Sequence, residues 1–237
     1  MTEDMSQSER PPAPPPPVPP VPPGPPMPPG SQGVPRWPAT IALLAVGFLL
    51  AVAATQLDVS SLQLPLLIIG ILAVPLTLAS IYGRHDIRHR LGMIALAILT
   101  VAVALSAVYL VRQLVGGVIE APSLLAGSAA IWAANLGTFA LWYWEIDGGG
   151  PAERRRDGHK STDFLFPQMQ IGDGTATGWW PGFLDYTFVA FNASSAFSPT
   201  DTLILSRRAK ILMMVQSLIS LVTVVVIAAR AINTLNS

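Results

Sequence analysis

A short run of polar side chains near the C-terminal end has the groups needed to bind an ion or a small polar solute. Asn192, Ser194 and Ser195 close an aromatic segment, and Asp201 follows shortly after. Amide, hydroxyl and carboxylate oxygens that interrupt an apolar stretch are typical of ion and solute pathways. The other interpretation of segment 183–197 is an amphipathic helix lying in a membrane interface, with its aromatic rings among the headgroups.

Asp201 has two interpretations of its own. As a carboxylate at the mouth of a pore, it would attract cations. The same residue also completes a helix-capping pattern, with Ser198 as N-cap, Pro199 at the first helical position and Asp201 at the third. This second interpretation predicts that the last long helix begins here.

A polar stripe marks the last apolar run. Gln216, Ser220 and Thr223 recur at helical spacing and would lie on one side of a helix. Such a stripe lines a conduit or, more commonly, forms hydrogen bonds between packed helices. Asn135 lies within an earlier apolar run, and we expect its partner on the last helix. Small residues on that earlier run predict close helix packing, namely Ala130, Ala133, Ala134 and Gly137.

The other reactive residue types argue against an enzyme. The chain has no cysteine, which excludes disulfides and thiolate chemistry. His85 and His89 have the four-residue spacing of a metal pair, but three arginines surround them, so we interpret the segment as a basic turn. Residues 148–150 are three glycines, interpreted as a flexible break. Without a recognisable acid–base or metal constellation, we expect no catalysis, no metal and no cofactor.

The elements that position these residues are membrane-spanning helices. Hydrophobic residues make up 51% of the chain and charged residues only 12%. Five apolar runs have about the 20 residues that a helix needs to cross a bilayer. We therefore predict an all-α integral membrane protein with about five transmembrane helices, plus a re-entrant or interfacial half-helix at 183–197. The five runs are 39–57, 62–82, 91–111, 124–144 and 211–232.

Composition divides the chain into four parts. Residues 1–38 hold 16 of the 23 prolines and predict a disordered cytoplasmic tail, either a spacer or a ligand for a proline-binding protein partner. Residues 39–145 form a four-helix transmembrane region. A polar loop rich in glycine and arginine covers 146–178. Residues 179–237 hold the half-helix and the fifth transmembrane helix.

The distribution of basic residues predicts the orientation. With the N-terminus in the cytoplasm, 12 of the lysines and arginines lie inside and only 2 outside. This indicates a multi-pass protein of the cell membrane, consistent with a bacterial inner membrane, in contact with lipid and not with nucleic acid. Trp142, Tyr143 and Trp144 would then form an aromatic belt at the inner interface.

Two resemblances follow from the second half of the chain. The stretches LWYWEIDGGGP (141–151), DFLFPQ (163–168) and AFSPTDT (196–202) resemble an uncharacterised family of bacterial multi-pass membrane proteins, over residues 130–235. This resemblance implies the topology and no particular activity. The order of a short aromatic helix, a polar end, an aspartate and a long apolar helix is similar to the two-helix potassium-channel pore module. Residues 192–198 stand where that family has its Thr-Val-Gly-Tyr-Gly filter, and they lack the filter glycines.

These features predict a non-enzymatic membrane protein, either a scaffold or a subunit of a complex, which could also be a homo-oligomer. The alternative is a channel-like or transporter-like protein that uses segment 179–201. A membrane enzyme that acts on lipid is the third interpretation, and it has the least support from the residues.

Overall fold

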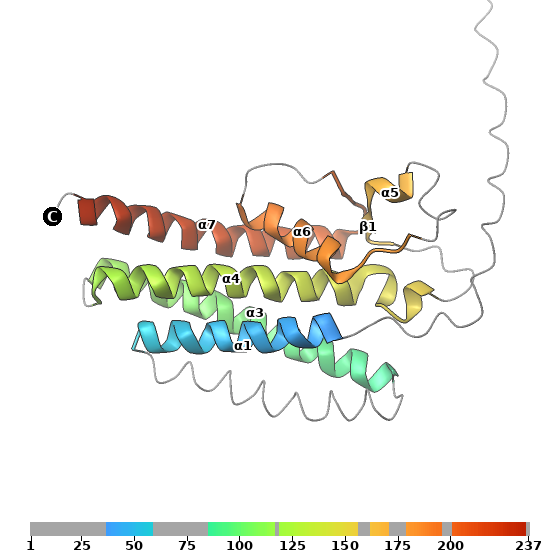
Figure 1. The fold of residues 1–237 in the computed structure, drawn as a ribbon, viewed down its shortest axis with the longest axis horizontal. Coiled ribbons are helices and arrows are strands. Elements are labelled where there is room, and N and C mark those ends of the chain that lie inside the picture. Colours follow the sequence, from blue (N-terminus) through green and yellow to red (C-terminus); the bar gives the residue numbers. More distant parts are fainter. Residues whose placement is uncertain are drawn as a thin grey trace, which may run out of the picture.

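The described part of the chain is a helical bundle with one very short sheet (Figure 1). The computed structural model describes residues 37–58, 85–116, 119–155, 162–170, 179–195 and 201–235. The predicted tail and the predicted run 62–82 lie outside these residues, apart from two tail residues. The α-helices are α1 (Trp37–Gln56), α3 (His85–Gly116), α4 (Ala121–Ile146), α5 (Pro167–Gln170), α6 (Phe183–Ser195) and α7 (Arg207–Leu235).

Four helices of the described part are long and apolar enough to cross a membrane, and they match four of the five predicted runs. Each offers a long apolar window with few charges. The mainly helical character of the chain is therefore confirmed for the described residues. These four segments are Trp37–Gln56, His89–Gly116, Ala121–Gly149 and Arg207–Ile232.

Helix α4 is the centre of the bundle. It contacts α1, α3, α6 and α7, and in Figure 1 it runs between α1 on one side and α7 on the other. Its candidate span is 61% buried inside the protein, against 28% for that of α7. The small residues and Asn135 that α4 carries therefore face other helices.

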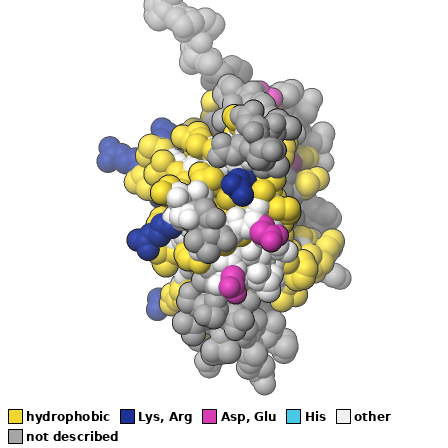
Figure 2. All heavy atoms as spheres, turned by 90° about the vertical axis from the view of Figure 1, so that its left-hand side faces the viewer, with side chains coloured by type: hydrophobic (Ala, Val, Ile, Leu, Met, Phe, Trp, Pro, Cys, Tyr) yellow, Lys and Arg dark blue, Asp and Glu magenta, His cyan; other side chains and the backbone are white. Residues whose placement is uncertain are grey.

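Apolar side chains cover much of the outside of the long helices. Phe48 on α1, Leu105 on α3 and Leu218 on α7 are all more than half exposed. Figure 2, viewed from the end where α7 terminates, shows apolar side chains flanking a more polar centre. Helices that expose apolar residues outward and bury polar ones inward have the pattern expected of a bundle surrounded by hydrocarbon.

Glycines on α4 allow α1 to approach closely, as the small-residue pattern predicts. A Cβ atom built on Gly137 would lie 2.6 Å from Cγ2 of Val46, and one on Gly127 would lie 2.9 Å from Cδ2 of Leu57. Real side chains almost never come so close, so α1 and α4 depend on the missing methyl groups.

Replacing Gly137 with alanine should therefore destabilise the bundle by about 1 to 3 kcal/mol, the usual cost of overpacking. Gly92→Ala is the matched control, because a Cβ there meets nothing within 4 Å and alanine favours a helix. Unfolding by SDS in mixed micelles, followed by circular dichroism, measures both variants. Equal stability of the two would show that the α1–α4 contact is looser than described.

The start of α7 differs from the predicted cap. Asp201 lies in a bend, β2 (Leu203–Ile204) follows, and α7 begins only at Arg207. The Ser206 hydroxyl caps the helix by accepting a hydrogen bond from the Ala209 N–H at 3.2 Å. The prediction of Asp201 as the third residue of this helix was therefore wrong.

The physical reason lies in a pairing that is distant in sequence. Strand β2 pairs antiparallel with β1 (Phe164–Leu165), with Phe164 opposite Ile204 and Leu165 opposite Leu203. The Leu205 N–H also donates to the carbonyl oxygen of Asp163 at 2.9 Å. These backbone bonds hold 203–205 extended, so a local capping pattern cannot start the helix there.

Candidate functional site

A buried polar seam joins α4, α6 and α7, and Gln216 is at its centre. Its side-chain Nε2 donates to the carbonyl oxygen of Ala190 and to Oγ of Ser194, both at 2.7 Å. Its Oε1 accepts from the hydroxyl of Tyr143. Asn135 Nδ2 donates to the backbone carbonyl of Gln216 at 3.2 Å. The expected partner of Asn135 on the last helix is thereby confirmed.

The seam also closes the C-terminal end of α6. The last carbonyls of a helix have no partner within it. Here the Ser220 hydroxyl and the Trp132 indole N–H both donate to the carbonyl of Ser194, the latter at 3.4 Å. The Ser217 hydroxyl donates to the carbonyl of Ala193 at 3.1 Å. Side chains of α4 and α7 thus satisfy the end of the half-helix inside the bundle.

Only three of the seven predicted site residues meet in this seam, namely Ser194, Gln216 and Ser220. The Thr223 hydroxyl is buried but donates to Ile219 O within α7. Asn192 and Ser195 donate to carbonyls of their own helix, those of Phe188 and Phe191, both at 2.9 Å.

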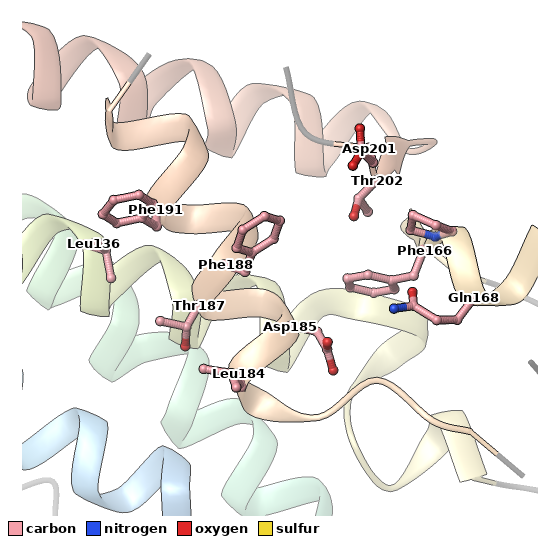
Figure 3. A pocket seen from close by; sticks show the side chains of 11 residues that line it. Leu136, Phe166, Gln168, Leu184, Asp185, Thr187, Phe188, Phe191, Asp201 and Thr202 are labelled. Atoms are coloured by element: carbon pink, nitrogen blue, oxygen red, sulfur yellow. The ribbon is translucent and has the colours of Figure 1, made fainter. Parts of the chain in front are cut away.

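Asp201 lies away from the seam. It is exposed and lines a cavity of about 550 Å³ that runs along α6 (Figure 3). The seven residues therefore do not form one site, because α6 presents Ser194 to the seam and Asn192 to the outside.

A second cluster, which no sequence pattern suggested to us, is built on Asp147. This aspartate is fully buried where α4 ends. One carboxylate oxygen accepts from the N–H groups of Asp163 and Phe164, at 2.7 and 3.2 Å, and from the Thr162 hydroxyl at 2.9 Å. The other accepts from the Tyr186 hydroxyl at 2.5 Å. Asp147 thus fastens the loop after α4, together with α6, to the end of α4.

The glycine triplet makes this arrangement possible. Gly148, Gly149 and Gly150 all have positive φ, at 56°, 84° and 103°. Residues with a Cβ rarely adopt these angles, so the tight turn requires glycine. The turn brings the Gly148 N–H within 3.0 Å of the Asp163 carboxylate. The segment interpreted as a flexible break is a defined turn with a structural task.

Two arginines satisfy the C-terminal carbonyls of α4. Arg154 Nη1 donates to Trp144 O at 2.8 Å and to Asp147 O at 2.7 Å. Arg208, from the start of α7, donates to Ile146 O at 2.9 Å. Cations at this end complement the negative end of the helix dipole. The basic residues counted as evidence of orientation therefore also hold the fold together.

The Arg154 guanidinium is enclosed by aromatic rings. Its central carbon lies 4.9 Å from the ring centre of Trp144 and 5.1 Å from that of Tyr186. Tyr143 and Trp144 are at most 2% exposed. Both were predicted to stand among lipid headgroups, and that prediction was wrong. They pack instead against Phe164 and Tyr186, respectively.

Asp163 forms a two-pronged ion pair with Arg208, whose Nε and Nη2 lie 2.8 and 2.6 Å from its carboxylate oxygens. Burial raises the pKa of Asp163. Hydrogen bonds from Arg208, Ser206 and the Gly148 N–H, with the charge of Arg208, outweigh that effect and hold this pKa below its usual value.

The lowered pKa of Asp163 predicts a specific loss of stability in acid. A pKa lower in the folded than in the unfolded chain adds stability that is present above the unfolded value, near 3.8, and is lost below it. We expect Asp163→Asn to be less stable than the wild type by a constant amount at pH 6 to 8. The gap should narrow as the pH falls below about 4. SDS titrations at each pH measure this difference in stability. A difference that does not change with pH would contradict the ion pair.

The segment around His85 and His89, interpreted as a basic turn, is instead the beginning of a helix. His85 and His89 both lie in the first turns of α3. His89 Nδ1 lies 3.4 Å from Oε2 of Glu145. No group of three or more metal-type side chains occurs in the described ranges.

Comparison with known proteins finds no matching family model, no matching curated protein and no matching solved structure. The two resemblances drawn from the sequence therefore stay predictions.

Proposed function

We propose that this chain is an integral membrane protein with a non-enzymatic role, as a scaffold or a subunit of a membrane complex. The four long apolar helices and their exposed apolar faces support insertion into a bilayer. The uneven count of basic residues supports a cytoplasmic N-terminus. The resemblance to uncharacterised multi-pass bacterial proteins agrees with both points.

The proposal rests on Gln216, whose side-chain hydrogen-bonding groups all have partners within the protein. A residue that lines a pathway must exchange its hydrogen bonds with the passing solute. Both donors of the Gln216 amide and its oxygen are instead occupied by Ala190, Ser194 and Tyr143. Gln216 and Ser220 of the polar stripe thus form hydrogen bonds between helices, which is the common use of such residues in membrane bundles.

Reconstitution and native mass spectrometry test this role together. We expect the full chain in liposomes to carry no flux of K⁺, Na⁺ or H⁺ under imposed gradients. We also expect a mass above that of one chain after mild extraction from the native membrane. Residues 1–36 should be needed for any partner that binds the tail, so their deletion should lower that mass by more than the deleted residues themselves account for and leave the helix content unchanged. A single bare chain in both forms, which is 25.1 kDa for the undeleted protein, would contradict the scaffold role.

One observation favours the channel-like alternative. Among the described residues, no donor reaches the buried Oδ1 of Asn135. A buried acceptor without a donor is costly, and a water molecule or a cation would satisfy it. Flux in liposomes that falls in both Asn135→Leu and Asp201→Asn would establish this alternative and displace the scaffold proposal.

The orientation has its own test. The chain lacks cysteine, so single cysteines at Thr175 and Ser237 can be labelled without background. With an impermeant thiol reagent on intact cells, we expect Ser237→Cys to react and Thr175→Cys to stay unlabelled until the cells are opened. Labelling of Thr175→Cys from outside would reverse the proposed orientation of this loop and favour a pore-loop arrangement.

A further inference from the structure

The cavity beside α6 has walls of two different kinds. Aromatic and aliphatic side chains from α4, α6 and the segment around α5 form most of its lining, including Leu136, Phe166 and Phe191. Two carboxylates, those of Asp185 and Asp201, and the amide of Gln168 join them. Figure 3 shows Phe166 and Phe188 on either side of the cavity, with Asp185 on α6 and Asp201 on the segment that faces it.

Phe166 and Asp185 are held in place by contacts of their own. The Phe166 ring packs edge-on against Tyr186 and Trp179, with centroids 5.3 and 5.9 Å away. The Asp185 carboxylate accepts a hydrogen bond from the Gly182 N–H at 2.7 Å, which fixes it at the start of α6. A preformed site loses less entropy when it binds a ligand.

The charge of the lining selects one class of ligand. Its two ionisable side chains are both acidic, and no lysine, arginine or histidine is among the described lining residues. A cation gains from the carboxylates and from the faces of aromatic rings. A bare divalent metal would need about six oxygen ligands, and this mostly apolar wall does not supply them.

We propose that this cavity binds a lipophilic organic cation, that is, a substituted ammonium or phosphonium that carries apolar groups. The rings of Phe166, Phe188 and Phe191 hold the apolar groups, and Asp185 and Asp201 neutralise the charge. The same chemistry occurs in a free amphiphilic cation and in the amine headgroup of a lipid.

Binding of tetraphenylphosphonium to the full chain in maltoside micelles, measured by calorimetry, tests this inference. Tetraphenylborate has the same shape and the opposite charge, and we expect it to bind at least about tenfold more weakly. Asp201→Asn and Phe188→Leu should each weaken the phosphonium about three- to tenfold. Both residues are exposed, so the fold should tolerate the changes.

Two matched variants control for unspecific effects. Asp58→Asn removes an exposed aspartate at the end of α1, where asparagine tolerates the positive φ of 52°. Phe48→Leu removes an exposed ring on α1. Both should bind the phosphonium like the wild type. Equal binding of borate and phosphonium, or cavity variants indistinguishable from these controls, would overturn the proposal.

A competition experiment then separates the two sources of the ligand. Phosphatidylethanolamine added to the micelles should weaken phosphonium binding if the natural ligand is a lipid amine, whereas diacylglycerol should not. If the phosphonium binds in the charge-dependent manner above and neither lipid competes, the site takes a free cation.

Discussion

Replacing Asp147 with alanine should destabilise the protein by about 3 to 5 kcal/mol, the usual loss when one partner of a buried charged network is removed. The change leaves the N–H groups of Asp163 and Phe164 and the Tyr186 hydroxyl without their acceptor, in a region that water does not reach. It also removes the carboxylate 3.9 Å from Arg154. Buried donors left unpaired carry their full desolvation cost.

Two further variants make this prediction specific. Asp147→Asn keeps the shape and one acceptor oxygen, so we expect a smaller loss than for alanine. Glu120→Ala removes an exposed carboxylate at the other end of α4, which caps nothing, and should change the stability by less than about 0.5 kcal/mol. SDS titration measures all three variants. If Asp147→Ala matched Glu120→Ala, the cluster would contribute nothing to the fold.

Replacing Gln216 with leucine should cost about 2 to 4 kcal/mol. The change removes three interhelical hydrogen bonds, and in membrane bundles each contributes about 0.6 to 1.7 kcal/mol. Because these bonds hold α6 against α4 and α7, we expect α6 to loosen before the rest of the bundle. Hydrogen exchange at the amides of residues 183–195 should then rise selectively.

Thr223→Val is the matched control for the seam. Its hydroxyl bonds only to its own helix, at Ile219 O, although it is as deeply buried as Gln216. Loss of that bond should be nearly neutral and should leave the exchange of α6 unchanged. Equal effects of the two substitutions would mean that burial, and not bonding between helices, decides the stability of the seam.

The candidate spans and the small-residue packing surface were predictable from the sequence. Long apolar runs must form helices when no water is available to the backbone, so composition alone indicates them. The half-helix at Phe183–Ser195 was also predictable. Its apolar stretch is too short for a membrane-spanning helix, so the sequence predicts a shorter helix there. Gly137 on α4 likewise predicts a close contact with another helix, but the sequence does not predict that Val46 is the partner.

The cluster at Asp147 and the grouping of the polar residues were decided only by the tertiary structure. Asp147, Asp163 and Arg208 are distant in sequence and meet because a glycine turn and a two-residue strand pairing return the chain to the end of α4. Local patterns carry no information about such long-range contacts. For this reason the predicted helix cap at Ser198 and the predicted aromatic belt at Trp144 were wrong. The sequence by itself determined which segments are apolar helices, since that depends on hydration alone. Which polar groups satisfy one another was decided by how those helices pack.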